Sequence, residues 1–213
     1  ARQLGIGQGQ TDQKRWSMFR VADMLRLFQK YRGDALVIPD RCARHWQGIS
    51  TNPKRDIPLG DPAMGGHASF AFGLAEARPN EKVVLFDSEG DLLMNLGVLA
   101  TIAELKPRNF YHFLMDNECY ATTGGQPVPN SSAISYSGIA REAGYPSTYF
   151  FDDLEELADK IEMILNQPGP VFVHMKIVPE IENEPIRRRP RWQTRTLDEV
   201  LRDIKETLGV DAQ

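Results

Sequence analysis

The sequence is poor in cysteine and contains no long apolar run, and each absence excludes a class of protein. The 213 residues include two cysteines, Cys42 and Cys119, which give neither a disulfide framework nor the paired spacing of a zinc site. No apolar stretch approaches the roughly 20 residues that a membrane span needs, and no segment has the pattern of a signal peptide. We therefore expect a cytoplasmic protein without a membrane partner.

An excess of positive charge is missing too. The chain has 25 Lys and Arg residues against 29 Asp and Glu residues, which gives a net charge of −4 at pH 7. A protein of this charge has no general basic field that would attract nucleic acid or an anionic membrane surface. We therefore expect no nucleic-acid partner.

What the sequence does contain is an alternation of strand-type and helical segments. Five short apolar segments are typical of strands, at 35–39, 82–86, 109–115, 147–151 and 169–177. Six segments have helical character, at 17–31, 67–77, 92–105, 134–144, 152–165 and 196–209. Because the strand segments are apolar on both faces and alternate with helices, they predict an α/β fold, a single three-layer domain with a mostly parallel sheet.

Helix-capping patterns support the last two helical segments. Asp152 with Glu155, and Thr196 with Glu199, have the spacing of a capping box. Gly209 is expected to end the last helix. The predicted elements divide the chain into a flexible lead-in at 1–16, a domain at 17–178, and a C-terminal tail and helix at 179–213.

Carboxylates follow two of the predicted strands directly. The segment 87–91 reads Asp-Ser-Glu-Gly-Asp and the pair 116–117 reads Asp-Asn. In a parallel sheet ligands bind at the carboxyl ends of the strands, where carboxylate, amide and carbonyl oxygens suit a hard cation. A glycine-containing helix start suits a phosphate group. The residues alone leave two interpretations open, a metal-bridged diphosphate or a set of helix caps and turn residues.

These motifs resemble those of enzymes that use thiamin diphosphate. Such enzymes carry Gly-Asp-Gly at a helix start and, further along, Asn-Asn at a strand end. Here residues 88–90 read Ser-Glu-Gly and residues 116–117 read Asp-Asn. In order, the segments 60–87, 92–102 and 117–128 look like the diphosphate-binding domain of the phosphonopyruvate and sulfopyruvate decarboxylases, and the resemblance covers roughly residues 18–178. It implies the thiamin-diphosphate-binding fold.

The resemblance also implies a metal site for Mg²⁺ or Ca²⁺. Its ligands would be Glu89, the side chain of Asn117 and the backbone carbonyl of Cys119. The family's aspartate is replaced by Glu89, which is one methylene longer, so Asp87 and Asp91 stay open as alternative ligands. We expect Asp91 to cap the helix instead.

Further residues acquire roles in the same way. The resemblance places backbone N–H groups of Gly90 and Asp91 opposite the diphosphate. The cofactor-binding residues that it implies are Met64, Gly65, Ser88, Gly90, Asp91 and Asp116. It places Thr122, Thr123 and Gln126 over the reacting centre, where these side chains could hydrogen-bond to the substrate. His67, which opens a predicted helix beside a glycine-rich turn, is either a capping or structural histidine or a catalytic residue near the substrate. By contrast, His112 and His174 lie inside apolar segments and are expected in the core.

The activity implied is that of a thiamin-diphosphate-dependent decarboxylase subunit acting on a small anionic 2-oxo acid. Two alternatives remain open: a carboligase or the small subunit of a 2-oxoacid oxidoreductase, and a non-catalytic regulatory or scaffold subunit. Every motif found belongs to the diphosphate-binding half of such enzymes. The resemblance therefore implies a separate pyrimidine-binding subunit that supplies the catalytic glutamate, in an α₂β₂ assembly. Trp46 and the apolar residues near 60–66 are expected at that contact.

Overall fold

The computed structural model describes residues 18–60, 63–185, 188–189 and 191–210. Its main element is a five-stranded sheet in the order β1-β2-β3-β7-β6, in which all four pairings are parallel. Its strands are β1 (Leu36–Pro39), β2 (Val83–Ser88), β3 (Phe110–Asp116), β6 (Ser147–Phe151) and β7 (Val171–Lys176). The expected α/β fold with a mostly parallel sheet is confirmed. The predicted lead-in at 1–16 lies outside the described residues.

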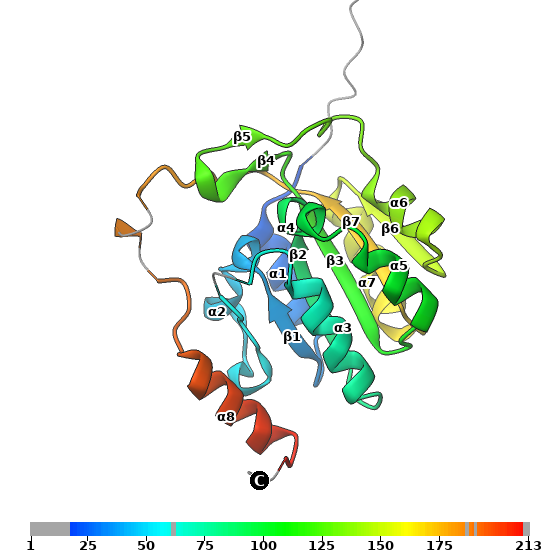
Figure 1. Ribbon diagram of the computed structural model, residues 1–213, viewed down its shortest axis with the longest axis vertical. Coiled ribbons are helices and arrows are strands. Elements are labelled where there is room, and N and C mark those ends of the chain that lie inside the picture. The colour runs from blue at the N-terminus through cyan, green and yellow to red at the C-terminus, as the bar shows by residue number, and fades with distance from the viewer. Residues whose placement is uncertain (1–17, 61–62, 186–187, 190, 211–213) are drawn as a thin grey trace, which may run out of the picture.

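Helices cover both faces of this sheet (Figure 1). One face carries α1 (Val21–Gln29), α2 (Trp46–Ile49) and α7 (Leu154–Asn166). The other carries α3 (His67–Ala77), α5 (Val98–Leu105) and α6 (Tyr136–Ala143). α8 (Leu197–Thr207) lies beside residues 53–55 and adds Val200 and Ile204 to the margin of this second core. Along each strand, successive side chains enter opposite cores: Val84 and Phe86 pack with the first group, Val83 and Leu85 with the second. This is the three-layer arrangement that the two-sided apolar strands predicted.

Trp46 belongs to the first core, so its expected place at a subunit contact was wrong. The side chain is fully buried. Its ring packs edge-on against Phe28 and Phe86, at centroid distances of 5.5 and 5.7 Å. A fully enclosed ring in an aromatic cluster contributes to the stability of the domain and is not available to a partner.

The helix predicted at 92–105 is divided in two. α4 (Glu89–Met94) ends at Asn95, and α5 begins at Val98. Asn95 has φ −144°, outside the helical region, and its amide donates to the backbone oxygen of Gly65 at 3.1 Å and to the hydroxyl of Ser69 at 3.0 Å. These bonds connect the break to the turn before α3. The apolar periodicity hid the break because both helices bury residues in the same core.

The capping predictions had mixed outcomes. Thr196 and Glu199 form the expected capping box at α8, and Gly209, with φ +61°, follows that helix. At α7 the cap is Asp153, whose side chain accepts from the backbone N–H groups of Glu155 and Glu156, so the choice of Asp152 was wrong by one residue.

Short elements connect the strands around one end of the sheet. They are η1 (Arg41–Ala43), η3 (Ala121–Thr123) and the antiparallel pair β4 (Cys119–Tyr120) and β5 (Gln126–Pro127). A further short element, η2 (Pro53–Arg55), lies away from that end, where Arg55 pairs with Glu81 just before β2. After β7 the chain passes along the β4–β5 hairpin and then runs down to α8 (Figure 1). In the part of the chain that the structure describes, no helix has the length and apolar character needed to cross a bilayer.

Candidate functional site

A pocket lies at the carboxyl ends of β1, β2, β3 and β7. Each strand contributes the residues that follow it: Asp40 after β1, Glu89 after β2, Asn117 after β3 and Val178 after β7. The hairpin and the residues around Met64 complete the wall. This is the edge where a parallel sheet binds ligands, and it brings together the two acidic motifs found in the sequence.

Glu89 is the most unusual group in this pocket. Its side chain is buried, and neither carboxylate oxygen has a hydrogen-bond partner of normal geometry among the described residues. Burial, followed by the charge of Asp116, raises the pKa of Glu89 to about 8. The backbone N–H groups of Glu89, Asn117 and Cys119 offset part of that rise. Burying an acceptor without a hydrogen-bond partner lowers the stability of the folded protein. A bound cation or hydrogen-bond donor at Glu89 would remove this cost.

Asp91 does not cap the helix, and that expectation was wrong. The cap is Ser88, whose hydroxyl accepts from the backbone N–H of Asp91 at 3.4 Å. The Asp91 carboxylate accepts from the backbone N–H of Gly65 at 2.6 Å and lies 3.1 Å from His67 Nδ1. Burial opposes ionisation, but these two partners hold the pKa of Asp91 below its usual range. Asp91 thus fastens the turn before α3 to the start of α4.

His67 lies behind the pocket wall, not in it. It is the first residue of α3 and is 3 % exposed. Its ring nitrogens face two carboxylates, Asp91 at 3.1 Å and Asp40 at 3.8 Å. Asp40 in turn accepts from the hydroxyl of Ser88 at 2.6 Å. His67 is absent from the described residues that line the pocket, so its contact with the site runs through Asp91 and Asp40.

The two histidines expected in the core are buried there, and each also holds an acid of the site. His112 Nε2 lies 2.8 Å from Asp87 Oδ2, and His174 Nε2 lies 2.8 Å from Asp116 Oδ2. Burial lowers the pKa of His112 to about 3, so this histidine is a neutral hydrogen-bond partner. Asp116 also pairs with Lys176 Nζ at 2.8 Å. Asp87 and Asp116 therefore both have hydrogen-bond partners within the chain, and the positive charge beside Asp116 is that of Lys176.

The segment after β3 folds back as the β4–β5 hairpin. Thr122 and Thr123 line the pocket, and the Tyr120 ring stands 3.2 Å from where a side chain at Gly90 would begin. Gln126 is exposed, bonds to Thr123 and is not among the described residues of the pocket lining. Of the substrate residues implied by the resemblance, the structure therefore brings Thr122 and Thr123 to the pocket surface and leaves Gln126 outside it.

Sequence reasoning missed a ring of charge at the pocket mouth. Arg41 and Arg44 follow β1, and Glu180 and Glu182 follow β7. The two pairs are far apart in sequence, so no local spacing could have joined them. A usable signal was present, because all four residues closely follow a predicted parallel strand and so lie at one edge of the sheet.

At the strand ends of this α/β fold, an acidic turn, an Asn-containing turn and a covering hairpin surround one pocket. The chain belongs to the thiamine pyrophosphate enzymes: residues 44–175 match the C-terminal TPP binding domain of that family. Among its relatives, the sulfopyruvate decarboxylase subunit beta of Methanothermobacter thermautotrophicus is 35 % identical over 144 residues, which cover 68 % of this chain and 73 % of that subunit.

Two further comparisons agree with this family. The phosphonopyruvate decarboxylase of Streptomyces viridochromogenes is 32 % identical over 162 residues, 75 % of this chain but 40 % of that enzyme. The benzoylformate decarboxylase of Polynucleobacter necessarius has the same fold, with a TM-score of 0.67 and 15 % identity over 82 % of this chain and 36 % of that one. The resemblance read from the sequence motifs is therefore confirmed.

Proposed function

We propose that this chain is the diphosphate-binding subunit of an enzyme that decarboxylates a small anionic 2-oxo acid. The similarity to sulfopyruvate and phosphonopyruvate decarboxylases supports this reaction class. Thiamin diphosphate supplies the nucleophile and the electron sink of such a reaction, while the protein binds and orients the reactants. Both cysteines are free thiols, which agrees with a reducing, cytoplasmic location.

The observation that carries the proposal is the unsatisfied carboxylate of Glu89. A hard divalent cation takes oxygen ligands, and Glu89 offers two buried oxygens that make no hydrogen bond of normal geometry to the described residues. The side chain of Asn117, buried beside it at the end of β3, and the Cys119 carbonyl would complete the protein's share of a Mg²⁺ or Ca²⁺ site. By comparison, Asp87 and Asp91 already have partners, which favours Glu89 as the ligand.

The cofactor contacts proposed from the motifs are compatible with the pocket. Gly90 has no side chain, so the diphosphate would be able to approach its backbone closely. A side chain at this position would also press on the Tyr120 ring. Met64 lies at the pocket rim and Gly65 beside it has φ +75°, with the Asp91 carboxylate bonded to its N–H. The remaining cofactor-binding residues of the proposal are Ser88 and Asp116.

For the substrate, we propose Thr122 as the contacting side chain. His67 would act as a positioning residue, because it meets Asp91 and Asp40 instead of the pocket. Gln126 would reach the substrate only if the hairpin moved, since its amide now bonds to Thr123.

The second half of the active site would come from a separate pyrimidine-binding subunit. The relatives named as subunit beta imply such a partner, and we propose an α₂β₂ assembly in which it supplies the catalytic glutamate. The apolar rim of the pocket suits this contact: its exposed apolar side chains include Met64 and Met94, at 57 % and 54 % exposure, and Phe70 on α3 is also exposed. Large exposed apolar groups are typical of subunit contacts.

The test is binding of thiamin diphosphate with Mg²⁺ to the chain co-purified with its partner, followed by CO₂ release from a panel of 2-oxo acids. Glu89→Ala should abolish cofactor binding, while the shorter carboxylate of Glu89→Asp should retain it. Equal cofactor affinity in Glu89→Ala and the parent protein would show that Glu89 is not the ligand. A parent complex that binds cofactor but releases no CO₂ from any 2-oxo acid would refute the reaction.

A further inference from the structure

The pocket mouth is crossed by a segment that lies beyond the residues matched to the family. We call residues 178–185 the strap. The backbone N–H of Glu182 donates to the Ala121 oxygen at 2.9 Å, which fastens the strap to the hairpin. Ile181 lies directly against Gly125, where any added side chain would collide with it. The strap and the hairpin therefore form one side of the pocket together.

Two acidic side chains of the strap enter ion pairs with arginines that follow β1. Glu180 lies 2.5 Å from Arg44 and 2.8 Å from His45 Nε2. Glu182 lies 2.7 Å from Arg41. Both glutamates and both arginines line the pocket.

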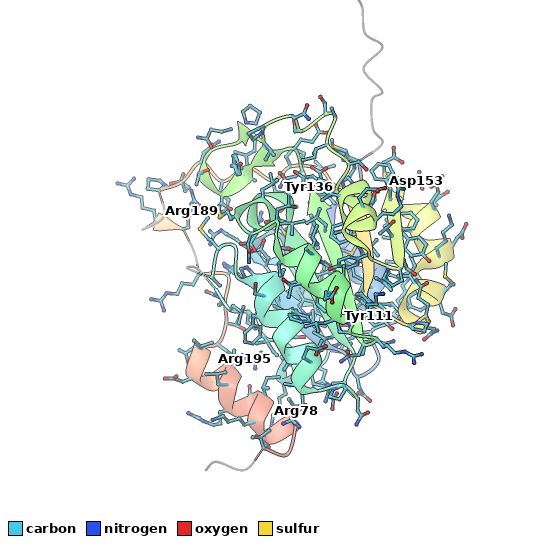
Figure 2. All side chains as sticks on the ribbon, turned by 45° about the vertical axis from the view of Figure 1, so that its right-hand side comes forward. Arg78, Tyr111, Tyr136, Asp153, Arg189 and Arg195 are labelled. Atoms are coloured by element: carbon cyan, nitrogen blue, oxygen red, sulfur yellow. The ribbon has the colours of Figure 1, made fainter. Side chains whose placement is uncertain are left out.

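Arg189 adds a third contact to this arrangement. It pairs with Glu182 at 2.9 Å and donates to the Thr122 backbone oxygen at 2.6 Å. Figure 2 shows its side chain beside the hairpin. The strap is thus held by the ion pairs of Glu180 and Glu182 and by a backbone hydrogen bond to the hairpin.

These ion pairs are partly enclosed, and that decides their meaning. The side chains of Arg41 and Glu182 are 14 % and 19 % exposed. A guanidinium removed this far from water needs an anionic partner, and its planar fork matches carboxylate, phosphate, phosphonate and sulfonate groups alike. Two glutamates placed in a pocket that takes an anionic ligand would repel that ligand unless they can leave.

We propose that Arg41 and Arg44 form a binding site for a multiply charged phosphate, phosphonate or sulfonate group, and that Glu180 and Glu182 occupy it until the ligand arrives. The ligand would displace both carboxylates, and the strap would separate from the hairpin. This inference rests on the proposed function for the kind of ligand. Two sources share this chemistry, the second acidic group of the substrate and the diphosphate of the cofactor.

The experiment measures binding by calorimetry on the full chain co-purified with its partner. The probes are phosphonoacetate, which has two acidic groups and no 2-oxo group to react, acetate as a single-charge control, and thiamin diphosphate with Mg²⁺. In Glu180→Gln/Glu182→Gln the internal competitors are weakened, so phosphonoacetate should bind on the order of tenfold tighter. Arg41→Gln/Arg44→Gln should lose on the order of tenfold in phosphonoacetate affinity. Arg41→Lys/Arg44→Lys should have an affinity between that of the glutamine variant and the parent protein, because lysine keeps the positive charge without the planar fork of arginine. Acetate affinity should change little.

Glu184→Gln is the matched control, because Glu184 is an exposed strap residue whose carboxylate has no hydrogen bond or ion pair with the described residues. Hydrogen exchange gives a second readout: phosphonoacetate should speed exchange of the Glu182 N–H in the parent protein. If the cofactor alone has both effects and phosphonoacetate has neither, the diphosphate is the ligand of the site. Unchanged affinity for both probes in Glu180→Gln/Glu182→Gln relative to Glu184→Gln would overturn the proposal. Failure of the parent complex to bind the cofactor at all would instead refute the proposed function.

Discussion

Replacing Glu89 with methionine should change the stability of the protein in opposite directions with and without the cofactor. Methionine is unbranched and fills irregular space, so it keeps the side-chain stem while removing the carboxylate. In the protein without metal, the change removes two buried oxygens that make no hydrogen bond of normal geometry to the described residues. An unsatisfied buried polar group costs about 1–3 kcal/mol, and we expect the free energy of unfolding to rise by an amount in that range.

The presence of ligand should reverse the comparison. A ligand that binds only the folded state adds about 2.7 kcal/mol at 100 times its Kd and about 4.1 kcal/mol at 1,000 times its Kd. The parent protein should gain this stabilisation from thiamin diphosphate with Mg²⁺, whereas Glu89→Met should gain none. The variant should therefore be the more stable protein in EDTA and lose that lead when both ligands are added.

Urea unfolding at one fixed pH, followed by circular dichroism, measures the free energy of unfolding both in EDTA and with thiamin diphosphate and Mg²⁺ present. Glu89→Asp is the control, because it retains a carboxylate and should remain sensitive to the cofactor. A variant that is less stable than the parent protein in EDTA would show that the carboxylate is already satisfied within the chain. Stabilisation of Glu89→Met by the cofactor would show that the metal is held elsewhere, and Asp91 would be the next residue to change.

Three further predictions address the fold and the assembly. Arg32→Ala should lower the free energy of unfolding by about 3–5 kcal/mol, because it leaves Asp56 buried without the guanidinium 2.7 Å away; Arg26→Ala, in an exposed pair, should stay within about 0.5 kcal/mol by the same urea titration. The chain alone, at saturating cofactor and Mg²⁺, should show no CO₂ release, and full turnover without a partner would refute the split site. Residues 120–131 should gain protection from hydrogen exchange when cofactor and a substrate analogue bind to the complex, and unchanged exchange there would remove any role for the hairpin as a cover.

The alternation of apolar segments predicted the sheet well, because a strand that is buried on both faces consists of consecutive apolar residues, as in the segment 82–86. Helix ends were less certain, because neighbouring residues of one type compete for the same role. Asp152 and Asp153 have the same side chain, so the sequence does not distinguish them as caps. The backbone conformation of Asp153 is what makes it the N-cap of α7. At Asn95 the helical spacing of apolar residues continues across a break in the helix. The hydrogen bonds made by Asn95 at this break go to Gly65, in the turn before α3, and to Ser69, in α3, so the local spacing does not reveal them.

The site was predictable where its residues are consecutive and unpredictable where they are not. Residues 87–91 and 116–117 predicted an acidic pocket, because both segments directly follow predicted strands of a parallel sheet. The partners that hold those acids come from other strands: His112 opposite Asp87 and His174 opposite Asp116. Such pairings depend on strand order and register, which a single sequence does not reveal.

The strand order has a consequence for how the chain is made. β3 lies at the centre of the sheet, and its second neighbour is β7, through pairings from Tyr111 with Val171 to Asp116 with Lys176. β6 leaves the ribosome earlier but reaches the sheet only through β7. Until residue 176 has been synthesised, one edge of β3 therefore has no strand beside it. An open, apolar strand edge readily pairs with other chains, so nascent or truncated chains that end before β7 should aggregate. The edge of the sheet that carries the pocket can close only in the final stage of folding.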